Sequence, residues 1–431
     1  MEQLLHYVWK HRLFPMGGLA TTDGKPVEVI DSGLHNTGSG PDFFNAKVKI
    51  GGQLWVGNVE IHDKASDWFA HGHDRDSAYD NVVLHVVGAS DAAVCDTGGR
   101  PIAQAVLGVP RRVADNYREL LATERFPPCY RVVPRLRPLT VRAWLAALQA
   151  ERLEEKTGAI ARRAAAHQGD WEGALFVTLA RNFGFGINGD AFEEWARSFT
   201  LNTAGRHRDN LFQIEALFMG QAGLLDPGAL PPRYREAAMA DSEFVRLGRE
   251  YAFLAHKYGL HPISHRMWRF LRLRPQNFPH IRIAQLARLY FDRRLSLSAL
   301  VECDTAEGVA ALLQTRATPY WQTHYAFGVE SAPSAKRLTA QSAALVVINT
   351  AVPVLFAYGR HTMNERLCDR ALALLDGMKA ENNAIVRAWR DCGLEARTAG
   401  DSQALIQLRR AYCDRRECLR CRIGYEYLKG L

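Results

Sequence analysis

The 431-residue sequence lacks the patterns of a secreted or membrane-anchored chain. Residues 1–7 contain no basic start followed by an apolar run, so no secretory signal is expected. The apolar stretch 343–358 is shorter than the roughly 20 residues of a spanning helix and predicts a buried core helix. Eight scattered cysteines do not form a secreted disulfide framework. These absences predict a cytoplasmic protein in a reducing compartment, with no membrane partner.

Two further absences narrow the class of protein. The sequence contains neither a Walker-type phosphate loop nor a Rossmann glycine pattern, so nucleotide-driven chemistry has no support. The glycines at 183–186 (FGFG) predict a helix-ending loop. No repeat of fixed period occurs, which argues against a solenoid.

Charge is distributed unevenly along the chain. Residues 1–90 contain seven Lys/Arg, eleven Asp/Glu and seven of the fifteen histidines, whereas the whole chain has a net charge of +8. An acidic, histidine-rich segment joined to a basic remainder suits a cation site beside a surface that binds a polyanion. A chance imbalance on solvated faces explains the same numbers equally well.

Hydrophobic periodicity predicts an α+β protein with a small mixed-sheet domain at 1–110 and a large all-α region at 111–431. The expected elements of the first domain are a helix at 2–13, strands at 27–30, 44–50, 54–62 and 82–87, and a hairpin at 94–107. The expected longer helices are 141–166, 171–182, 210–225, 243–258, 283–293, 336–348, 364–392 and 402–412.

The residues with the clearest chemical potential are Pro41-Asp42 and Glu60-Ile61-His62. Asp42 opens one strand, and Glu60 and His62 lie two apart on the next, so they project from one face while Ile61 turns into the core. Pairing of these strands would bring Asp42 close to Glu60. Their carboxylates and the backbone carbonyl of Ile61 would then form an oxygen site for Mg²⁺ or Mn²⁺. A loop-capping Asp42 and a Glu60 paired with a lysine are the alternative.

These residues, in an αβββ(α)β order, resemble the PD-(D/E)xK or restriction-endonuclease-like nuclease superfamily over about the first ninety residues. The resemblance implies a restriction-endonuclease-like fold and metal-dependent cleavage of DNA or RNA, with Asp42, Glu60 and His62 as catalytic residues. His62 stands where the superfamily usually has lysine. An imidazole there can still orient or deprotonate the attacking water.

A second resemblance covers nearly the whole chain. The segments 40–43 (GPDF), 57–62 (GNVEIH), 66–68 (SDW), 71–73 (HGH), 84–87 (LHVV) and 274–287 (RPQNFPHIRIAQLA) look like those of a family of uncharacterised bacterial proteins. That family carries only the label of a domain of unknown function, so the resemblance implies no activity.

The histidines that follow Glu60-Ile61-His62 could supply a second set of metal ligands. His71 and His73 could extend the site, or could form a metal-free polar loop. A different class of metal hydrolase, with His62, His71 and His73 around Zn²⁺, is a further interpretation. His85 lies mid-strand between apolar residues and is expected to be a hydrogen-bonded core histidine.

Cys413, Cys418 and Cys421 form a close cluster near the C-terminus. Thiolates with this spacing in a reducing compartment often bind Zn²⁺ or an iron–sulfur cluster, for which Cys129 or Cys392 would be the fourth ligand. Some PD-(D/E)xK nucleases resemble this plan, with three C-terminal cysteines and a distant one, and Cys129 is preferred here. The expected role of the metal is structural, and three ordinary thiols are the alternative.

Arginines are interleaved with aromatic residues at 266–282 and again at 409–429. Guanidinium groups beside aromatic rings suit phosphate contacts and base stacking, and Arg272, Arg274 and Arg282 are predicted to bind nucleic acid. Arginines that satisfy helix ends or buried carboxylates are the alternative. The sequence therefore favours a metal-dependent nuclease; the competing hypothesis is a catalytically inactive nucleic-acid-binding or scaffold protein.

Overall fold

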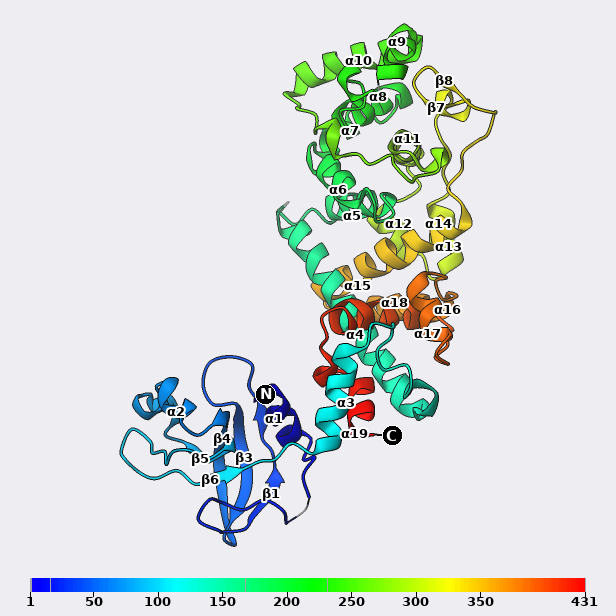
Figure 1. Cartoon of the computed structure of the whole chain (residues 1–431). Coiled ribbons are helices and arrows are strands. Elements are labelled where there is room, and N and C mark those ends of the chain that lie inside the picture. Colours follow the sequence, from blue (N-terminus) through cyan, green and yellow to red (C-terminus); the bar gives the residue numbers. More distant parts are fainter. Residues whose placement is uncertain (1, 16, 167, 231, 431) are drawn as a thin grey trace. The chain divides into compact units, whose positions relative to one another are not determined.

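The computed structural model describes residues 2–15, 17–166, 168–230 and 232–430. It joins a six-stranded mixed sheet near the N-terminus to a mostly helical remainder, which confirms the α+β class (Figure 1). Strands give way to helices between β6 (Gln104–Val106) and α3 (Arg111–Ala122), near residue 110. The chain divides into two compact units, which are residues 1–144, 387–395 and 408–431 (unit 1) and residues 145–386 and 396–407 (unit 2).

Unit 1 contains the sheet, the helices that directly follow it in the chain and the helical C-terminal segment. Its elements are α1 (Glu2–Lys10), β1 (Val27–Asp31), β2 (Leu34–His35), β3 (Phe43–Ile50), β4 (Gln53–Lys64), α2 (Asp67–Ala70), η1 (His73–Arg75), η2 (Ser77–Tyr79), β5 (Val82–Ala89), β6 (Gln104–Val106), α3 (Arg111–Ala122), η3 (Val133–Arg135), the π-helical η9 (Leu408–Cys413), η10 (Cys418–Arg420) and α19 (Arg422–Lys429). The division between the units falls within α4 (Pro138–Ala166) and α17 (Ala384–Arg390).

The sheet has the strand order β1-β3-β4-β5-β6, with the short β2 also paired to β3. β3 is antiparallel to β1 and β4, whereas β4, β5 and β6 are mutually parallel. The predicted hairpin turn between β3 and β4 is present, and Gly51 and Gly52 make it possible because both adopt positive φ angles, of 57° and 88°. α1 and α2 lie on opposite sides of this sheet (Figure 1).

The second half of β4 is covered on both faces, because Val59, Glu60, Ile61 and His62 are all buried. Val59 and Ile61 project from one face, while Glu60 and His62 project from the other, the side on which Trp68 of α2 lies. The strand therefore presents two titratable side chains beneath a helical segment rather than in open solvent.

Two sequence predictions for individual elements were wrong. The expected hairpin at 94–107 is reduced to one bridge between Cys95 and Pro101, and β6 pairs in parallel with β5 instead. The expected helix 364–392 is two helices, because the chain leaves helical geometry after Gly377 and the side chain of Asn383 accepts a hydrogen bond from the Val386 amide at the start of the next helix.

Unit 2 is built of helices around one large apolar core, together with a short hairpin. Its elements are α5 (Trp171–Phe183), α6 (Gly189–Arg197), α7 (Leu201–Gly205), α8 (Leu211–Gln221), η4 (Pro227–Ala229), α9 (Pro232–Ala240), α10 (Ser242–Tyr258), η5 (His265–Met267), η6 (Pro275–Asn277), α11 (Pro279–Phe291), α12 (Leu297–Glu302), α13 (Ala306–Leu312), η7 (Tyr320–Gln322), β7 (His324–Ala326), β8 (Val329–Glu330), α14 (Ala340–Val346), the π-helical η8 (Val347–Ala351), α15 (Val352–His361), α16 (Glu365–Gly377) and α18 (Ala399–Gln407).

The apolar helical stretch Ala340–His361 belongs to this core. Among the described residues it is the one helix long and apolar enough to cross a membrane, and 61% of its most apolar window is buried inside the protein. Val346, Val352 and Leu355 are fully buried there. The burial agrees with the core helix predicted from the sequence.

Candidate functional site

The predicted motif residues meet at the edge where β3 begins and β4 ends. Glu60 and His62 lie on one face of β4, with only 5% and 1% of their surfaces exposed. The backbone N–H of Asp42 donates to Glu60 Oε2 at 3.0 Å, and the N–H of Ile61 donates to Asp42 Oδ2 at 2.9 Å. This reciprocal pair of hydrogen bonds locks the two carboxylates together, as strand pairing predicted.

Three histidines gather beside Glu60. One ring nitrogen from each of His62, His71 and His73 lies within 4.8 Å of the other two. His62 Nε2 is 3.1 Å from His71 Nδ1, and Glu60 Oε1 is 3.3 Å from His73 Nε2 and 3.6 Å from His62 Nε2. His71 is exposed while the other two are buried, so the cluster opens to solvent at His71.

The turn after α2 brings the second and third histidines to the strand. His71 ends α2, and His73 begins the single helical turn η1. Gly72 between them has a φ of 75°, in the left-handed region that residues with a side chain disfavour. This reversal lets both imidazoles approach His62 although they are two residues apart in the chain.

The Nδ1 side of His62 is connected by hydrogen bonds to His85 and, through His85, to Gln104. His62 Nδ1 lies 2.8 Å from His85 Nε2, and His85 Nδ1 lies 3.3 Å from Gln104 Nε2 on β6. The donor and acceptor roles along this line depend on the histidine tautomers. A metal ion at His62 Nε2 would require the proton of neutral His62 to lie on Nδ1, where it would be donated to His85 Nε2. His85 is therefore the buried, hydrogen-bonded histidine that the sequence predicts.

Burial controls the charge of the site. Burial and the adjacent imidazoles lower the pKa of His62 to about 4, and burial and His62 lower the pKa of His85 to about 3. Burial and the charge of Asp42 raise the pKa of Glu60, although His73 opposes this shift. His62 and His85 are thus neutral near pH 7, and the neutral form is the one in which histidine binds metal ions.

Two further residues of the site, His6 and Gln104, were not predicted from the sequence. His6 of α1 places Nε2 3.3 Å from Asp42 Oδ2. Burial alone would lower the pKa of His6, but the hydrogen bond and charge of Asp42 outweigh it and raise the pKa. Gln104, which orients His85, lies on a strand whose pairing partner was not predicted. A lone histidine on a helix and a lone glutamine carry no sequence signal of such roles.

The four candidate cysteines lie together in unit 1. Cys129, Cys413, Cys418 and Cys421 line one small cavity, and all four are free thiols. Burial and the neighbouring thiols raise the pKa of Cys421 to about 11 and that of Cys129 well above its usual value. Cys392, the other candidate for a fourth ligand, does not line this cavity.

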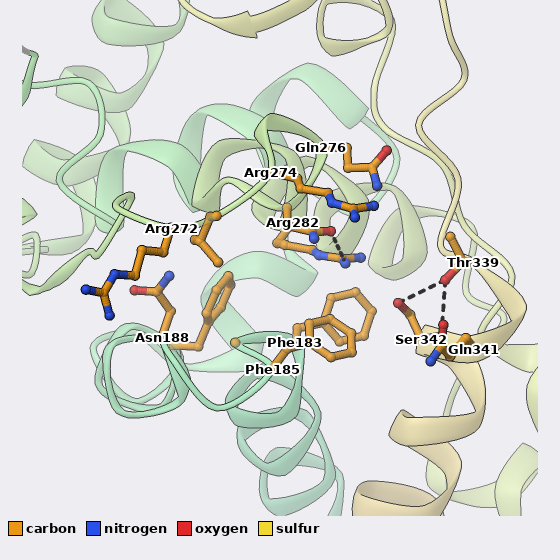
Figure 2. Close-up of a pocket in the computed structure, with 14 residues that line it drawn as sticks. Phe183, Phe185, Asn188, Arg272, Arg274, Gln276, Arg282, Thr339, Gln341 and Ser342 are labelled. Atoms are coloured by element: carbon orange, nitrogen blue, oxygen red, sulfur yellow. Dashed lines mark hydrogen bonds between the residues drawn. The ribbon is translucent and has the colours of Figure 1, made fainter. Parts of the chain in front are cut away.

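The three predicted nucleic-acid-binding arginines lie in unit 2. Figure 2 shows the guanidinium groups of Arg274 and Arg282 directed to the same side, whereas that of Arg272 points away from them. Arg272, Arg274 and Arg282 line one cavity of about 580 Å³ (Figure 2). Arg282 is buried, whereas the other two are exposed. The cavity is therefore partly open to solvent, at Arg272 and Arg274.

The architecture and the cluster define an α+β protein with a candidate metal site of three histidines and a carboxylate. By sequence the chain belongs to the family described as "Protein of unknown function (DUF2851)", which it matches over residues 2–384. No curated protein and no solved structure matches the chain. The whole histidine–carboxylate cluster lies inside the matched range, whereas Cys413, Cys418 and Cys421 lie beyond it.

Proposed function

We propose that this protein is a metal-dependent nuclease whose cation is held by His62, His71, His73 and Glu60. The observation that carries the proposal is the meeting of three ring nitrogens within 4.8 Å of one another, with a carboxylate oxygen of Glu60 3.3 Å from one of them. Three imidazoles and a carboxylate from two separate segments of chain are a donor set that protein metal sites use repeatedly.

The donor set bears on the choice of metal. The sequence suggested an oxygen site for Mg²⁺ or Mn²⁺ formed by Asp42, Glu60 and the carbonyl of Ile61. The nitrogen-rich cluster suits Zn²⁺ or Mn²⁺ better than Mg²⁺, which prefers oxygen ligands. When bound, such a cation lowers the pKa of a water molecule and neutralises charge that develops on a phosphate.

The surrounding residues hold the ligands in place. Asp42 fixes the peptide between Glu60 and Ile61 and lies beside His6. His85 engages Nδ1 of His62, which leaves Nε2 directed toward the cluster. Outer partners of this kind orient metal-binding imidazoles. Asp42 thus acts on Glu60 through the backbone, and His62 serves as a ligand in addition to the water-positioning role that the motif suggested.

A phosphodiester substrate is supported by the order of the elements. The chain runs α1, β1, β3, β4, a helical segment and β5, which is the αβββ(α)β order that the PD-(D/E)xK resemblance implies, apart from the additional short β2. The excess of basic residues beyond residue 90 also favours a polyanionic substrate. A protein that binds nucleic acid without cleaving it is the competing function.

The first experiment measures cleavage of labelled single- and double-stranded DNA and RNA with Mg²⁺, Mn²⁺ or Zn²⁺. We expect cleavage with Zn²⁺ or Mn²⁺, its loss in Glu60→Gln and His73→Ala, and a decrease of about 10- to 100-fold in His85→Asn, because His85 acts through His62. His256→Asn, which alters an exposed histidine of α10, is the matched control and retains full activity.

Metal binding by calorimetry separates the possible outcomes. Zn²⁺ binding that is lost in His73→Ala, without cleavage of any substrate, would support the non-catalytic alternative. Cleavage that survives both Glu60→Gln and His73→Ala would show that this cluster is not the active site.

We also propose that Cys129, Cys413, Cys418 and Cys421 bind a structural Zn²⁺ ion or iron–sulfur cluster. The support is their shared cavity, which joins the segment after α3 to the C-terminal segment of unit 1. Four thiols are a complete ligand set for either group.

A further inference from the structure

A chemically distinctive cavity outside the histidine cluster lies in unit 2. It has a volume of about 580 Å³ and is formed by the loop after α5, the segment before α11 and the start of α14 (Figure 2). Its fourteen lining residues, all within the described chain, include three arginines and no acidic residue. Such a cavity has a strong electrostatic preference for an anion.

Arg282 is the central cation of this cavity. Only 6% of its surface is exposed. Its guanidinium donates to Gln285 Oε1 at 2.9 Å and to Asn277 Oδ1 at 2.7 Å, both neutral acceptors, while Nε has no partner among the described residues. No described carboxylate forms an ion pair with it. The protein therefore buries a positive charge without a counter-ion, at a cost that a bound anion would offset.

The position of Arg282 in its helix adds to that cost. It lies in the first turn of α11, where the helix dipole disfavours a cation. Burial lowers the pKa of Arg282 to about 10, so the group still carries its charge near neutral pH. Burial of the charge and its position at the positive end of the helix dipole both destabilise the folded protein. Residues kept at such a cost in stability are often those that bind a ligand.

Two strained residues border the same cavity. Phe185 and Arg272 have φ angles of 44° and 65°, in the left-handed region that favours glycine. Asn188 holds the segment that leads to Arg272, because its side chain accepts from the Arg269 N–H at 2.8 Å and donates to the Arg269 carbonyl at 2.9 Å. The arginine-bearing segment is thus held in a fixed, strained conformation, as ligand-binding segments often are.

The opposite wall is aromatic. Phe183 and Phe185 lie below the arginines in Figure 2, and the Arg282 guanidinium carbon is 4.4 Å from the centre of the Phe185 ring. The amide side chains of Gln276 and Gln341 also border the cavity. The cavity is much larger than an inorganic phosphate requires, and it offers aromatic surface as well as cationic groups.

We propose that this cavity binds a nucleotide, with the phosphate on Arg274 and Arg282 and the base against Phe183 and Phe185. Guanidinium groups bind phosphate through paired charged hydrogen bonds, and aromatic side chains stack on bases of any sequence. The nucleotide is either a free mononucleotide or the terminal nucleotide of a strand. The proposal rests on unit 2 alone and does not depend on the nuclease proposal.

Calorimetry with the full chain tests this binding. The ligands are AMP, adenosine, inorganic phosphate, and an oligonucleotide with either a 5′-phosphate or a 5′-hydroxyl end. We expect AMP, the phosphorylated oligonucleotide or both to bind, and adenosine and inorganic phosphate to bind much more weakly. Tighter binding of AMP identifies the free nucleotide as ligand, and tighter binding of the phosphorylated strand identifies the strand end.

Variants assign the binding to the cavity. We expect Arg274→Gln to weaken binding by roughly tenfold or more, because one charged hydrogen-bonding group is lost. Arg274 is exposed, so this variant keeps its fold. Arg282→Lys retains the charge but loses the guanidinium geometry, and it also weakens binding. Arg266→Gln is the matched control, since Arg266 is exposed in the same region and does not line the cavity.

Three results would overturn the proposal. They are the absence of binding by AMP and by the phosphorylated strand, affinity for inorganic phosphate equal to that for both nucleotides, and nucleotide binding that Arg274→Gln and Arg282→Lys leave unchanged. Loss of nuclease activity in Glu60→Gln has no bearing on any of them.

Discussion

Glu215 of α8 is a carboxyl group enclosed by the apolar core of unit 2. Its Oε1 atom accepts hydrogen bonds from Thr318 Oγ1 and Trp321 Nε1, each at 2.7 Å. Burial raises its pKa from 4.5 to about 7, and the two hydrogen bonds only partly oppose this rise. Glu215 is therefore protonated in the folded protein under conditions that ionise it in the unfolded chain.

This shift gives the stability of unit 2 a defined dependence on pH. Between pH 4.5 and about 7 the folded state retains a proton that the unfolded state releases, so raising the pH favours unfolding, and the full loss is present above about pH 7. The loss amounts to roughly 3 kcal/mol, from about 1.4 kcal/mol per pH unit. Glu215→Gln keeps an acceptor for Thr318 and Trp321 without the ionisation.

Urea unfolding at pH 5 and pH 8 measures the effect. We expect the wild type to lose more stability than Glu215→Gln between these two values, so that the variant is the more stable protein at pH 8. Equal losses in the two proteins would mean that Glu215 ionises in the folded state as readily as in the unfolded chain.

At the scale of elements, α8 and α10 pack so closely that a glycine is required between them. A methyl group on Gly220 of α8 would lie 2.0 Å from the Tyr251 ring of α10. Tyr251 is further fixed by the hydrogen bond that its hydroxyl donates to Gln221 Oε1 at 3.0 Å. The ring cannot move aside without the loss of that bond.

We expect Gly220→Ala to lower the free energy of unfolding by roughly 3 kcal/mol, the upper end of the cost of overpacking a core. Gly248→Ala is the matched control on α10, because nothing lies within 4 Å of its added methyl group. We expect it to stabilise the protein by up to about 1 kcal/mol through helix propensity. Urea-unfolding midpoints that shift equally for both variants would contradict the close packing of these helices.

The elements differ in how accurately they could be predicted from the sequence. The strands β3, β4 and β5 were predicted within two residues at each end, because short runs of β-branched and aromatic residues bounded by polar residues and glycine are a local pattern. The pairing of β6 with β5 and the break between α16 and α17 were missed. Both depend on partners distant in the chain, including the bridge between Lys379 and Thr398 that follows the end of α16.

At the scale of the whole molecule, the four cysteines bear on how unit 1 holds together. This unit is assembled from three separate stretches of the chain, and the thiols come from the first and the last of them. A bound metal would tie these stretches together, since the free energy of metal binding adds to that of folding.

We expect protein purified without exposure to air to contain zinc, or iron with inorganic sulfide, in a fixed ratio to the chain. Cys129→Ser should lose the metal and unfold at a lower temperature, whereas Cys303→Ser, outside the cavity, should change neither. Elemental analysis, visible absorption and thermal unfolding measure these outcomes. A metal-free wild type with the same unfolding temperature as Cys129→Ser would exclude the structural metal.

The sequence by itself determined the α+β class, the buried helix at 343–358, and the shared face of Glu60 and His62. Each of these follows from periodicity, which depends only on neighbouring residues. The proximity of Asp42 and Glu60 was also predictable from the sequence, because two strands joined by a short glycine turn pair with each other as a hairpin.

Only the tertiary structure decided which other side chains lie beside Asp42, Glu60 and His62. His71 and His73 reach His62 through the reversal at Gly72, His6 arrives from a helix, and Gln104 arrives from a strand in parallel pairing. The arginine cavity of unit 2 likewise depends on segments more than 150 residues apart, from Phe183 to Ser342. Contacts between such distant residues depend on the packing of a whole core. The burial of many apolar side chains there outweighs the local preferences from which sequence patterns are interpreted.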